Sequence, residues 1–203
     1  MAARLPKIIA IVLAAGRSVR MGANKLLADL GGKPLIRHSV EMLLASSVRD
    51  VIVVTGNAAE EVRRALHGLT VTFVHNLQFA DGLSASLKIG LNAVPSDADG
   101  FLICLADMPL VEAQTVNQLV SAFSVSGHHT ICVPVYEGIR GNPTLWGRQH
   151  FKALGSLAGD YGGKRLMESL ADEIFEVQVP SRAVLLDVDT PEALQEIKSI
   201  LNF

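Results

Sequence analysis

Four apolar runs that are almost continuous limit the fold of this chain more than any other feature. They cover residues 8–14, 51–55, 101–106 and 131–135. The runs do not alternate between apolar and polar residues, which is typical of strands buried on both faces of a parallel sheet. The sequence therefore predicts a sheet that is covered on both sides by other elements.

Segments of helical character lie between and after these runs. Residues 34–45, 58–66, 84–94 and 113–123 repeat apolar side chains at helical spacing, and the first of these segments opens with a proline. After residue 136 we expect glycine-rich loops, a short helix at 164–170, two strands and a final helix opened by Thr190 and Pro191. Alternating strands and helices predict an α/β, three-layer Rossmann-like fold with a mostly parallel central sheet.

Composition excludes several classes of protein. The 203 residues, 49% of them hydrophobic, predict a single domain over residues 1–203. The net charge of −2 comes from scattered charges, so we expect no nucleic-acid partner. The first apolar stretch is too short to span a bilayer, so we expect no membrane partner and a cytoplasmic location. Cys104 and Cys132 lie inside apolar runs without CxxC spacing, which indicates buried side chains and neither a disulfide nor a zinc site.

The loop after the first run has the composition of a phosphate-binding loop. It reads LAAGRSVRMGANK over residues 13–25, with glycines at 16 and 22 and cations at 17, 20 and 25. Glycine lets the backbone approach a ligand, and successive free amides can bind phosphate oxygens. The spacing fits neither the Walker motif nor GxGxxG, and a plain glycine turn with solvated arginines is the alternative. Three cations at the carboxyl end of a buried strand favour the phosphate site.

This loop resembles the signature of the MobA-like nucleotidyltransferases, which add GMP or CMP to molybdopterin. The resemblance implies a nucleotidyltransferase fold, with a nucleotide-binding part at about residues 7–135 and an acceptor-binding part at about 136–203. In the first loop it implies these nucleotide-binding residues: Leu13, Ala14, Ala15, Gly16, Arg17, Arg20, Gly22 and Lys25. The Ala14-Ala15 pair is similar to the cytidylyltransferase branch, since guanylyltransferases tend to have a glycine there. The resemblance therefore implies CTP, in preference to GTP, as the substrate.

An acidic residue ends the third apolar run. Asp107, followed by Met108 and Pro109, stands where a buried parallel strand emerges, and the proline prevents the strand from continuing. The alternative is that Asp107 caps a helix entered near Val111. The DMP motif resembles the one that supplies a magnesium ligand in the family, which implies that Asp107 binds Mg²⁺.

A second acidic segment, LLDVDTP at residues 185–191, precedes the final helix. Asp187 and Asp189 alternate there at the expected end of a strand, and a period of two places both on one face. The resemblance implies that one of the pair joins Asp107 on the metal. We favour Asp189 and keep Asp187 as its rival.

Three further segments complete the predicted site. Ser84 and Ser86 stand at the start of a helix, whose free amides suit an anion, and Ser84 alone also fits an ordinary helix cap. The resemblance implies that Ser84 borders the nucleotide. Segments 140–143 and 159–164 are similar to loops that face the pterin and its phosphate, which implies these acceptor-binding residues: Arg140, Asn142, Asp160, Gly163 and Lys164. Asn142 stands where some relatives carry histidine.

The reaction that the resemblance implies is attack by the terminal phosphate of molybdopterin on the α-phosphorus of CTP. Lys25, Asp107 and Asp189 are the expected catalytic residues, with Mg²⁺ as cofactor. A phosphate nucleophile is already ionised near neutral pH, so no general base is required. His38, His67 and His75 show no metal-ligand spacing, and we expect them to be surface or hydrogen-bonded residues.

Two alternatives remain at the level of sequence. A nucleotidyltransferase that uses GTP or another triphosphate, or that acts on a sugar or polyol phosphate, shares the first loop, but the GNP and GDYGG segments argue against it. A noncatalytic carrier of molybdenum cofactor is the other alternative, and the intact Lys25, Asp107 and Asp189 argue against it. For either an enzyme or a carrier, the expected protein partner is a molybdenum hydroxylase of the xanthine dehydrogenase type, in a transient complex.

Overall fold

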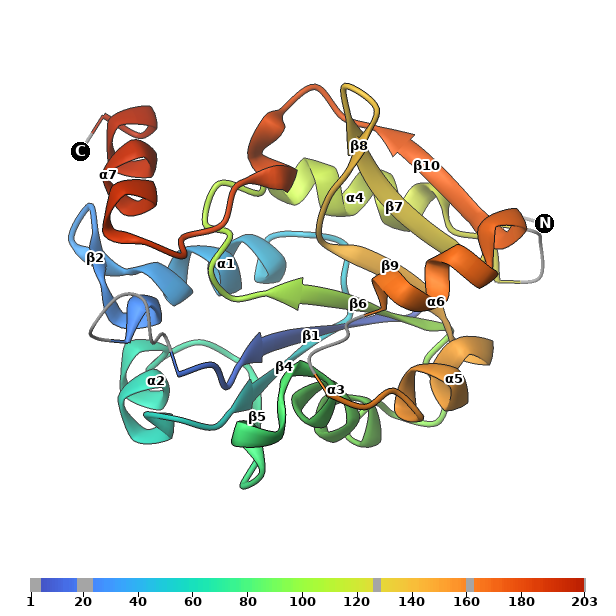
Figure 1. The fold of residues 1–203 in the computed structure, drawn as a ribbon, viewed down its shortest axis with the longest axis horizontal. Helices are drawn as coiled ribbons and strands as arrows, with labels where there is room; N and C mark the ends of the chain where they lie inside the picture. Colours follow the sequence, from blue (N-terminus) through green and yellow to red (C-terminus); the bar gives the residue numbers. More distant parts are fainter. Residues whose placement is uncertain (1–4, 18–23, 126–128, 160–162, 203) are drawn as a thin grey trace.

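The computed structural model describes residues 5–17, 24–125, 129–159 and 163–202, and a mixed, mostly parallel sheet runs through its centre (Figure 1). The strand order is β10-β7-β9-β6-β1-β4-β5, with β8 paired to β7. The strands are β1 (Ile8–Ala14), β4 (Asp50–Thr55), β5 (Thr72–His75), β6 (Gly100–Leu105), β7 (Ile131–Tyr136), β8 (Ile139–Arg140), β9 (Thr144–Gly147) and β10 (Ile174–Gln178). A separate small ribbon pairs β2 (Asp29–Leu30) with β3 (Lys33–Pro34).

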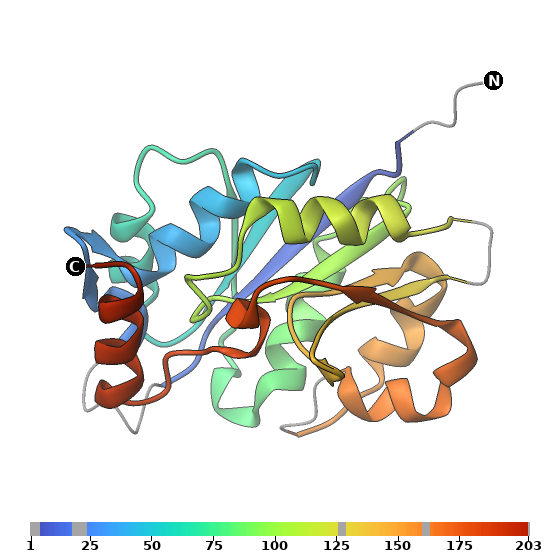
Figure 2. The same cartoon turned by 90° about the horizontal axis from the view of Figure 1, so that it is seen from above.

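Helices cover both faces of the sheet, as Figures 1 and 2 show. The α-helices are α1 (Leu35–Leu44), α2 (Ala59–Ala65), α3 (Leu83–Asn92), α4 (Ala113–Ala122), α5 (Phe151–Gly155), α6 (Lys164–Ser169) and α7 (Pro191–Ile200). The short 3-10 helices are η2 (Lys25–Leu27), η3 (Phe79–Asp81), η4 (Arg148–His150), η5 (Ala171–Glu173) and η6 (Arg182–Leu185). Side chains of α1, α2 and α4 pack on one face, and those of α3, α5 and α6 pack on the other. The three-layer Rossmann-like arrangement is therefore confirmed.

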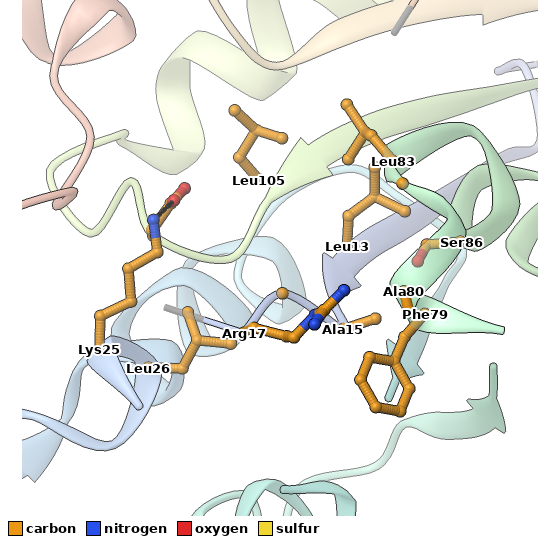
Figure 3. A pocket seen from close by; sticks show the side chains of 13 residues that line it. Leu13, Ala15, Arg17, Lys25, Leu26, Phe79, Ala80, Leu83, Ser86 and Leu105 are labelled. Atoms are coloured by element: carbon orange, nitrogen blue, oxygen red, sulfur yellow. Dashed lines mark hydrogen bonds and ion pairs between the residues drawn. The ribbon is translucent and has the colours of Figure 1, made fainter. Parts of the chain in front are cut away.

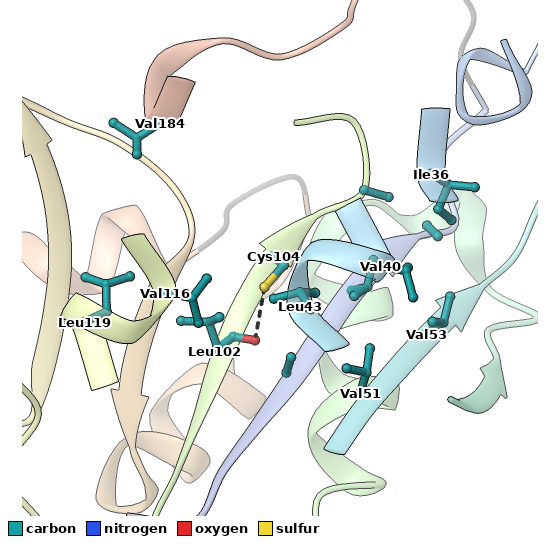
Figure 4. Close-up of a cluster of buried hydrophobic side chains, with 14 of the residues drawn as sticks. Ile36, Val40, Leu43, Val51, Val53, Leu102, Cys104, Val116, Leu119 and Val184 are labelled. Carbon is teal, nitrogen blue, oxygen red and sulfur yellow. Dashed lines mark hydrogen bonds between the residues drawn. The ribbon is translucent and has the colours of Figure 1, made fainter. Parts of the chain in front are cut away.

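The apolar runs are strands buried on both faces, as their sequence predicts. Along β1, Ala10 and Val12 join the cluster under α1, whereas Ile9 and Ile11 join the cluster under α3. Successive side chains of a strand point to opposite faces, so a strand between two helical layers needs apolar residues at every position. Figure 4 shows the first cluster, in which Val40 and other α1 side chains lie against β4 and β6. Each fully buried side chain of this size stabilises the fold by roughly 1.5–3 kcal/mol.

The last third of the chain extends the same sheet but differs from the sequence prediction. Strand β9, which the sequence analysis did not identify, lies antiparallel between β6 and β7. Of the two strands predicted after residue 170, the structure has β10. The expected strand before Asp187 is wrong, because residues 182–185 form η6 and residues 186–189 are not in a strand. Here the amide of Val188 donates to the carbonyl of Asp107 at 2.9 Å, so the segment pairs with a loop and not with the sheet.

The final helix begins as predicted. Thr190 is the N-cap of α7, its hydroxyl accepts a hydrogen bond from the amide of Ala193 at 3.2 Å, and Pro191 occupies the first helical position. Among the described residues, no helix combines the length and the hydropathy needed to cross a bilayer.

Candidate functional site

The carboxyl ends of the parallel strands β1, β4 and β6 meet at one edge of the sheet, where open α/β sheets bind ligands. Loops that follow β1, β5 and β6 enclose a cavity of about 370 Å³ there, which we call the first cavity. Its lining residues are Leu13, Ala15, Gly16, Arg17, Lys25, Leu26, Phe79, Ala80, Gly82, Leu83, Ser86, Leu105 and Asp107. In Figure 3, Lys25 and Phe79 stand on opposite sides of this cavity.

A lysine held between two carboxylates is the main electrostatic feature of this edge. The Nζ atom of Lys25 lies 2.5 Å from Oδ2 of Asp107 and 2.5 Å from Oδ1 of Asp189. The Lys25 and Asp107 side chains are each 15% exposed, and Asp189 is 31% exposed. Burial by itself would lower the pKa of Lys25, but the charges and hydrogen bonds of Asp107 and Asp189 outweigh burial and raise the pKa. The ammonium group therefore stays charged. Asp107 does not cap a helix, because α4 begins at Ala113 with Glu112 as its N-cap.

A third carboxylate joins the cluster. Oxygen atoms of Asp107, Asp187 and Asp189 all lie within 4.8 Å of one another. The Asp187 side chain is exposed, yet the partial loss of solvent around its carboxyl and the repulsion by Asp107 and Asp189 raise its pKa. Oδ1 of Asp107 is buried and has no hydrogen-bond partner in the described parts of the chain. Carboxylate oxygens, one of them unpaired, are the ligand atoms that Mg²⁺ and Mn²⁺ prefer, so the residues present fit such an ion.

The structure places the residues of the first loop at different depths. Leu13, Ala15, Gly16, Arg17 and Lys25 line the first cavity. Ala14 instead points into the core under α1 and is 1% exposed. Arg20 and Gly22 lie outside the described residues.

The first turn of α3 contributes a serine different from the one expected. Ser84 is buried, its amide donates to the carbonyl of Gly159 at 3.2 Å, and Ser84 is absent from the lining of the first cavity. The N-cap of α3 is Gly82, so Ser84 is not the cap either. Ser86 lines the cavity, and its Oγ accepts a hydrogen bond from Nδ2 of the buried Asn76 at 3.0 Å. Asn76 is not among the predicted site residues, because no local motif marks it.

Gly56, which had no predicted role, allows two lining residues of the first cavity to approach each other closely. A Cβ on Gly56, directly after β4, would lie 2.6 Å from Cβ of Phe79 and 2.8 Å from Cβ of Ala15. Both neighbours line the first cavity. The signal available in the sequence is a glycine at the carboxyl end of an apolar run.

A second cavity of about 480 Å³ adjoins the first and shares Leu13, Leu83 and Leu105 with it. Its other lining residues are Leu87, Ile103, Val133, Arg140, Gly141, Asn142, Thr144, Gly163, Met167 and Glu168. Among the residues predicted to bind the acceptor, Arg140, Asn142 and Gly163 are therefore brought together. Asp160 lies outside the described residues, and so does the side chain of Lys164, which opens α6.

The backbone around Asn142 is held from two sides. The amide of Gly141 donates to the carbonyl of Pro134 at 2.8 Å, and the amide of Asn142 donates to the carbonyl of Val184 at 2.9 Å. A Cβ on Gly141 would clash with that Val184 carbonyl, so glycine is required for this close approach. Nearby, Nε of Arg140 donates to Glu176 at 2.7 Å. The wall of the second cavity is thus fixed to β7 and to η6.

Residues that we expected to be inert are so placed. Cys104 and Cys132 are buried and free, and burial raises the pKa of both thiols, that of Cys132 to about 12. Nε2 of His38 lies 2.8 Å from the carbonyl oxygen of Leu30, whereas His67 and His75 are exposed. These placements confirm the sequence interpretation.

Known proteins share the sequence over different parts of the chain. The purine catabolism protein PucB of Bacillus subtilis is 30% identical over 210 positions, which cover 98% of this chain and 100% of PucB. The bifunctional protein GlmU of Kineococcus radiotolerans is 32% identical, but the match covers 68% of this chain and only 28% of GlmU. A probable molybdenum cofactor guanylyltransferase of Thermococcus sibiricus is 32% identical over 64% of this chain and 63% of that protein.

Solved structures share the fold over almost the whole chain. A homologue of Mycobacterium tuberculosis Rv0371c from Mycobacterium sp. strain JC1 superposes with a TM-score of 0.84, at 32% identity and 96% coverage of both chains. The Rv0371c protein of Mycobacterium tuberculosis in complex with manganese has a TM-score of 0.78, at 28% identity, and covers 95% of this chain and 98% of that chain.

The family is settled by a domain match that spans most of the chain. The model of the MobA-like NTP transferase domain matches residues 10–174. This segment contains the first loop, Asp107 and all the lining residues of the second cavity. The chain is a nucleotidyltransferase and belongs to the MobA-like NTP transferase family.

Proposed function

We propose that this enzyme transfers CMP from CTP to the terminal phosphate of molybdopterin and releases pyrophosphate. The observation that carries the proposal is the cluster of Lys25, Asp107 and Asp189 beside two adjoining cavities of different character. The first cavity, which has cations and loop amides, suits a nucleoside triphosphate. The second, which is largely apolar, suits the flat ring system of a pterin. In this proposal residues 1–203 act as one domain, with the nucleotide held mainly by residues 7–135 and the acceptor mainly by 136–203.

At the nucleotide end, the backbone of Ala15 and Gly16 and the side chain of Arg17 face the space that the triphosphate would fill. Arg20 and Gly22 complete this loop in the proposal. Lys25 would leave the carboxylates and neutralise phosphate charge once a divalent ion takes its place. A charged lysine that starts beside the reacting groups needs little movement to do this, and positioning and charge neutralisation supply most of the acceleration of phosphoryl-type transfer.

Asp107 and Asp189 would hold Mg²⁺. Asp187 belongs to the same cluster and is the alternative to Asp189 as the second ligand. When bound, the ion would neutralise negative charge on the phosphates. The ion pair that Lys25 makes with both Asp107 and Asp189 favours these two, because they already bind one cation together. The manganese complex of the Rv0371c protein, which shares this fold, supports a divalent ion.

In the reaction, an oxygen of the molybdopterin phosphate forms a bond to the α-phosphorus of CTP. The bond between that phosphorus and the oxygen bridging to the β-phosphate breaks, and pyrophosphate leaves with the electron pair. The nucleophile is already an anion near neutral pH, so no side chain has to remove a proton.

Recognition of cytosine rests on the Ala14-Ala15 pair in this proposal. Ala15 lines the first cavity, whereas Ala14 packs beneath it in the core and would act by fixing the path of the loop. Ser86 and Phe79 lie on the same side of the cavity as Ala15, opposite Lys25, and would offer a hydroxyl and an aromatic edge to the base. We include Ser84 only as a buried support for the same segment.

The cellular setting in this proposal is the cytoplasm, with a molybdenum hydroxylase as the recipient of the product. PucB, a relative that matches over its full length, is named a purine catabolism protein, and a molybdenum hydroxylase of the xanthine dehydrogenase type would act on purines. That similarity supports a transient complex with such an enzyme.

Thermal unfolding with CTP, GTP and ATP, each with and without Mg²⁺, tests the nucleotide half of the proposal. A ligand at about 100 times its dissociation constant stabilises the folded state by roughly 2.7 kcal/mol. For a chain of this length we expect a shift of about 5–10 °C with CTP and Mg²⁺ together, and little shift with GTP or ATP. A shift with GTP alone would contradict the choice of base.

Turnover tests the acceptor half. Wild-type protein with CTP, Mg²⁺ and molybdopterin should release pyrophosphate, whereas a hexose 1-phosphate in place of molybdopterin should not support release. Pyrophosphate release with the sugar phosphate and none with molybdopterin would refute the proposed acceptor while leaving the nucleotidyltransferase reaction intact.

A further inference from the structure

A buried threonine on β9 lines the second cavity, and its hydroxyl proton has no acceptor among the described residues. Thr144 is 8% exposed and lines the cavity. Its Oγ1 accepts a hydrogen bond from Nε1 of Trp146 at 2.9 Å. A hydroxyl that accepts one bond still carries a proton to donate, and the described residues provide no acceptor for it. The cavity therefore contains a donor whose oxygen is already held in place.

Trp146 is fixed on several sides and orients that hydroxyl. Its side chain is fully buried, and its ring meets the ring of His150 edge-on at a centroid distance of 5.7 Å. A Cβ on Gly163 would lie 2.6 Å from Cζ2 of Trp146, so the backbone at Gly163 lies directly against the indole. Gly163 lines the second cavity, whereas Trp146 does not. The indole thus supports two parts of the cavity wall, the Thr144 hydroxyl and the Gly163 backbone.

The rest of the cavity is suited to a flat ligand. Leu87, Ile103, Val133 and Met167 provide apolar surface, and the polar side chains of the lining are limited to Arg140, Asn142, Thr144 and Glu168. A sugar or polyol presents hydroxyls on all sides, and each buried hydroxyl without a partner is unfavourable. A heteroaromatic ring buries both faces against apolar side chains and needs hydrogen bonds only at its edge.

We propose that Thr144, oriented by Trp146, is a specificity-determining residue of the acceptor site, whose hydroxyl donates to an oxygen or nitrogen at the edge of a flat heterocycle. This inference rests on the proposed function, because it assumes that the second cavity holds the acceptor. Glu168, also in the lining, offers a carboxylate to N–H groups on the same ring system. Thr144 touches the ring, and Trp146 acts through Thr144 as a positioning residue.

Two substitutions at one position test the role of the hydroxyl. Thr144→Val removes the hydroxyl and keeps the shape, and Thr144→Ser keeps the hydroxyl. For Thr144→Val we expect the Kd and KM for molybdopterin to rise about 10-fold, because an unpaired buried acceptor atom on the ligand is unfavourable. In the same variant kcat should stay within about twofold and the Kd for CTP should not change, and Thr144→Ser should restore the wild-type values. Isothermal titration with molybdopterin measures Kd independently of turnover.

Trp146→Phe tests the positioning step, because phenylalanine fills most of the space but cannot donate to Oγ1. We expect a smaller rise in the Kd for molybdopterin, about 3-fold, since the hydroxyl remains but is no longer held. Far-ultraviolet circular dichroism and CTP binding check that each variant is folded, because loss of the single tryptophan changes the near-ultraviolet spectrum by itself.

Three outcomes would overturn the inference. If Thr144→Val bound molybdopterin with wild-type affinity, the hydroxyl would have no part in recognising the acceptor, and the proposed function would still stand. If Thr144→Ser did not restore affinity, the loss in Thr144→Val would have to be assigned to the shape of the side chain and not to the missing hydroxyl. Binding of a hexose 1-phosphate, but not molybdopterin, by the wild-type protein would instead refute the proposed acceptor, and this inference with it.

Discussion

The two adjoining cavities are built in different ways. The first is made by loops that follow strands β1, β5 and β6, and its main feature is the ion cluster around Lys25. The second is lined on one side by β1, β6, β7 and α3, which provide most of its apolar surface, and on the other by residues 140–142, Thr144, Gly163 and α6. Parallel strands carry their carboxyl ends to one edge, so any chain with this topology gathers charged loops there. The second cavity depends in addition on how the last third of the chain packs, because that part supplies its polar residues Arg140, Asn142, Thr144 and Glu168. Changes at residues that line only one cavity should therefore leave binding in the other intact, whereas Leu13, Leu83 and Leu105 line both.

Asp107→Asn should give the largest difference between the two cavities, because it should impair the reaction without changing ligand binding in the second cavity. The amide keeps the shape but removes the charge that pairs with Lys25 and would hold the metal, and we expect kcat to fall by about 100-fold or more. Molybdopterin affinity, measured by isothermal titration, should be unchanged. Asp172→Asn on the exposed surface is the matched control. A kcat near the wild-type value in Asp107→Asn would show that the Asp107 carboxylate has no part in catalysis.

The two remaining carboxylates should differ from each other. Asp189→Asn should reduce kcat nearly as much as Asp107→Asn, since Asp189 shares the Lys25 ammonium with Asp107. We expect Asp187→Asn to cost about 10-fold or less, because its carboxylate is exposed and has no ion pair with Lys25 within 4.0 Å in the described residues. The titration of pyrophosphate release with Mg²⁺ compares the variants. The reverse order would make Asp187 the second ligand.

A change confined to the second cavity should have a moderate effect. In Gly163→Ala the new Cβ would lie 2.6 Å from the Trp146 ring, so the backbone that lines the cavity must shift. We expect the KM for molybdopterin to rise about 10-fold with the KM for CTP unchanged, which corresponds to roughly 1.4 kcal/mol. Gly155→Ala, where nothing lies within 4 Å of the new Cβ, is the control. Equal rises in both KM values would mean that the cavities are coupled.

The smallest effect concerns the packing behind the second cavity. Nε2 of His150 lies 2.9 Å from Oγ1 of Thr130, and burial lowers the pKa of His150, with Glu173 opposing the shift. A neutral histidine in the folded state contributes stability that is present above its unfolded pKa of about 6.5 and is lost as the pH falls through the lower folded pKa. The free energy of unfolding in urea should therefore decrease between pH 7.5 and pH 5.5. His150→Gln should reduce this decrease, and an identical pH dependence in the variant would assign it to other groups.

Much of the first cavity could be predicted from local pattern, and less of the second. The first loop and Asp107 follow apolar runs, and a strand end can be located from the run itself. The sequence offered both Ser84 and Ser86 near the start of a helix. The structure shows that Ser86 lines the first cavity, whereas Ser84 is buried and does not line it. Thr144 carries no motif. Its role depends on Trp146, two positions away on the same face of β9, and on an antiparallel strand that is too short to show a clear period.

The sequence by itself determined that the sheet is mostly parallel and covered on both faces, that a glycine-bearing cationic loop leaves its first strand, and that Asp107 emerges at the same edge. These features follow from periodicity and from strand ends, which are local properties. Only the tertiary structure decided that Asp189, which lies 164 residues after Lys25, meets its ammonium, and that β9 inserts between β6 and β7. Both depend on contacts between distant segments, and such contacts form through the packing of the whole core, which no local pattern specifies.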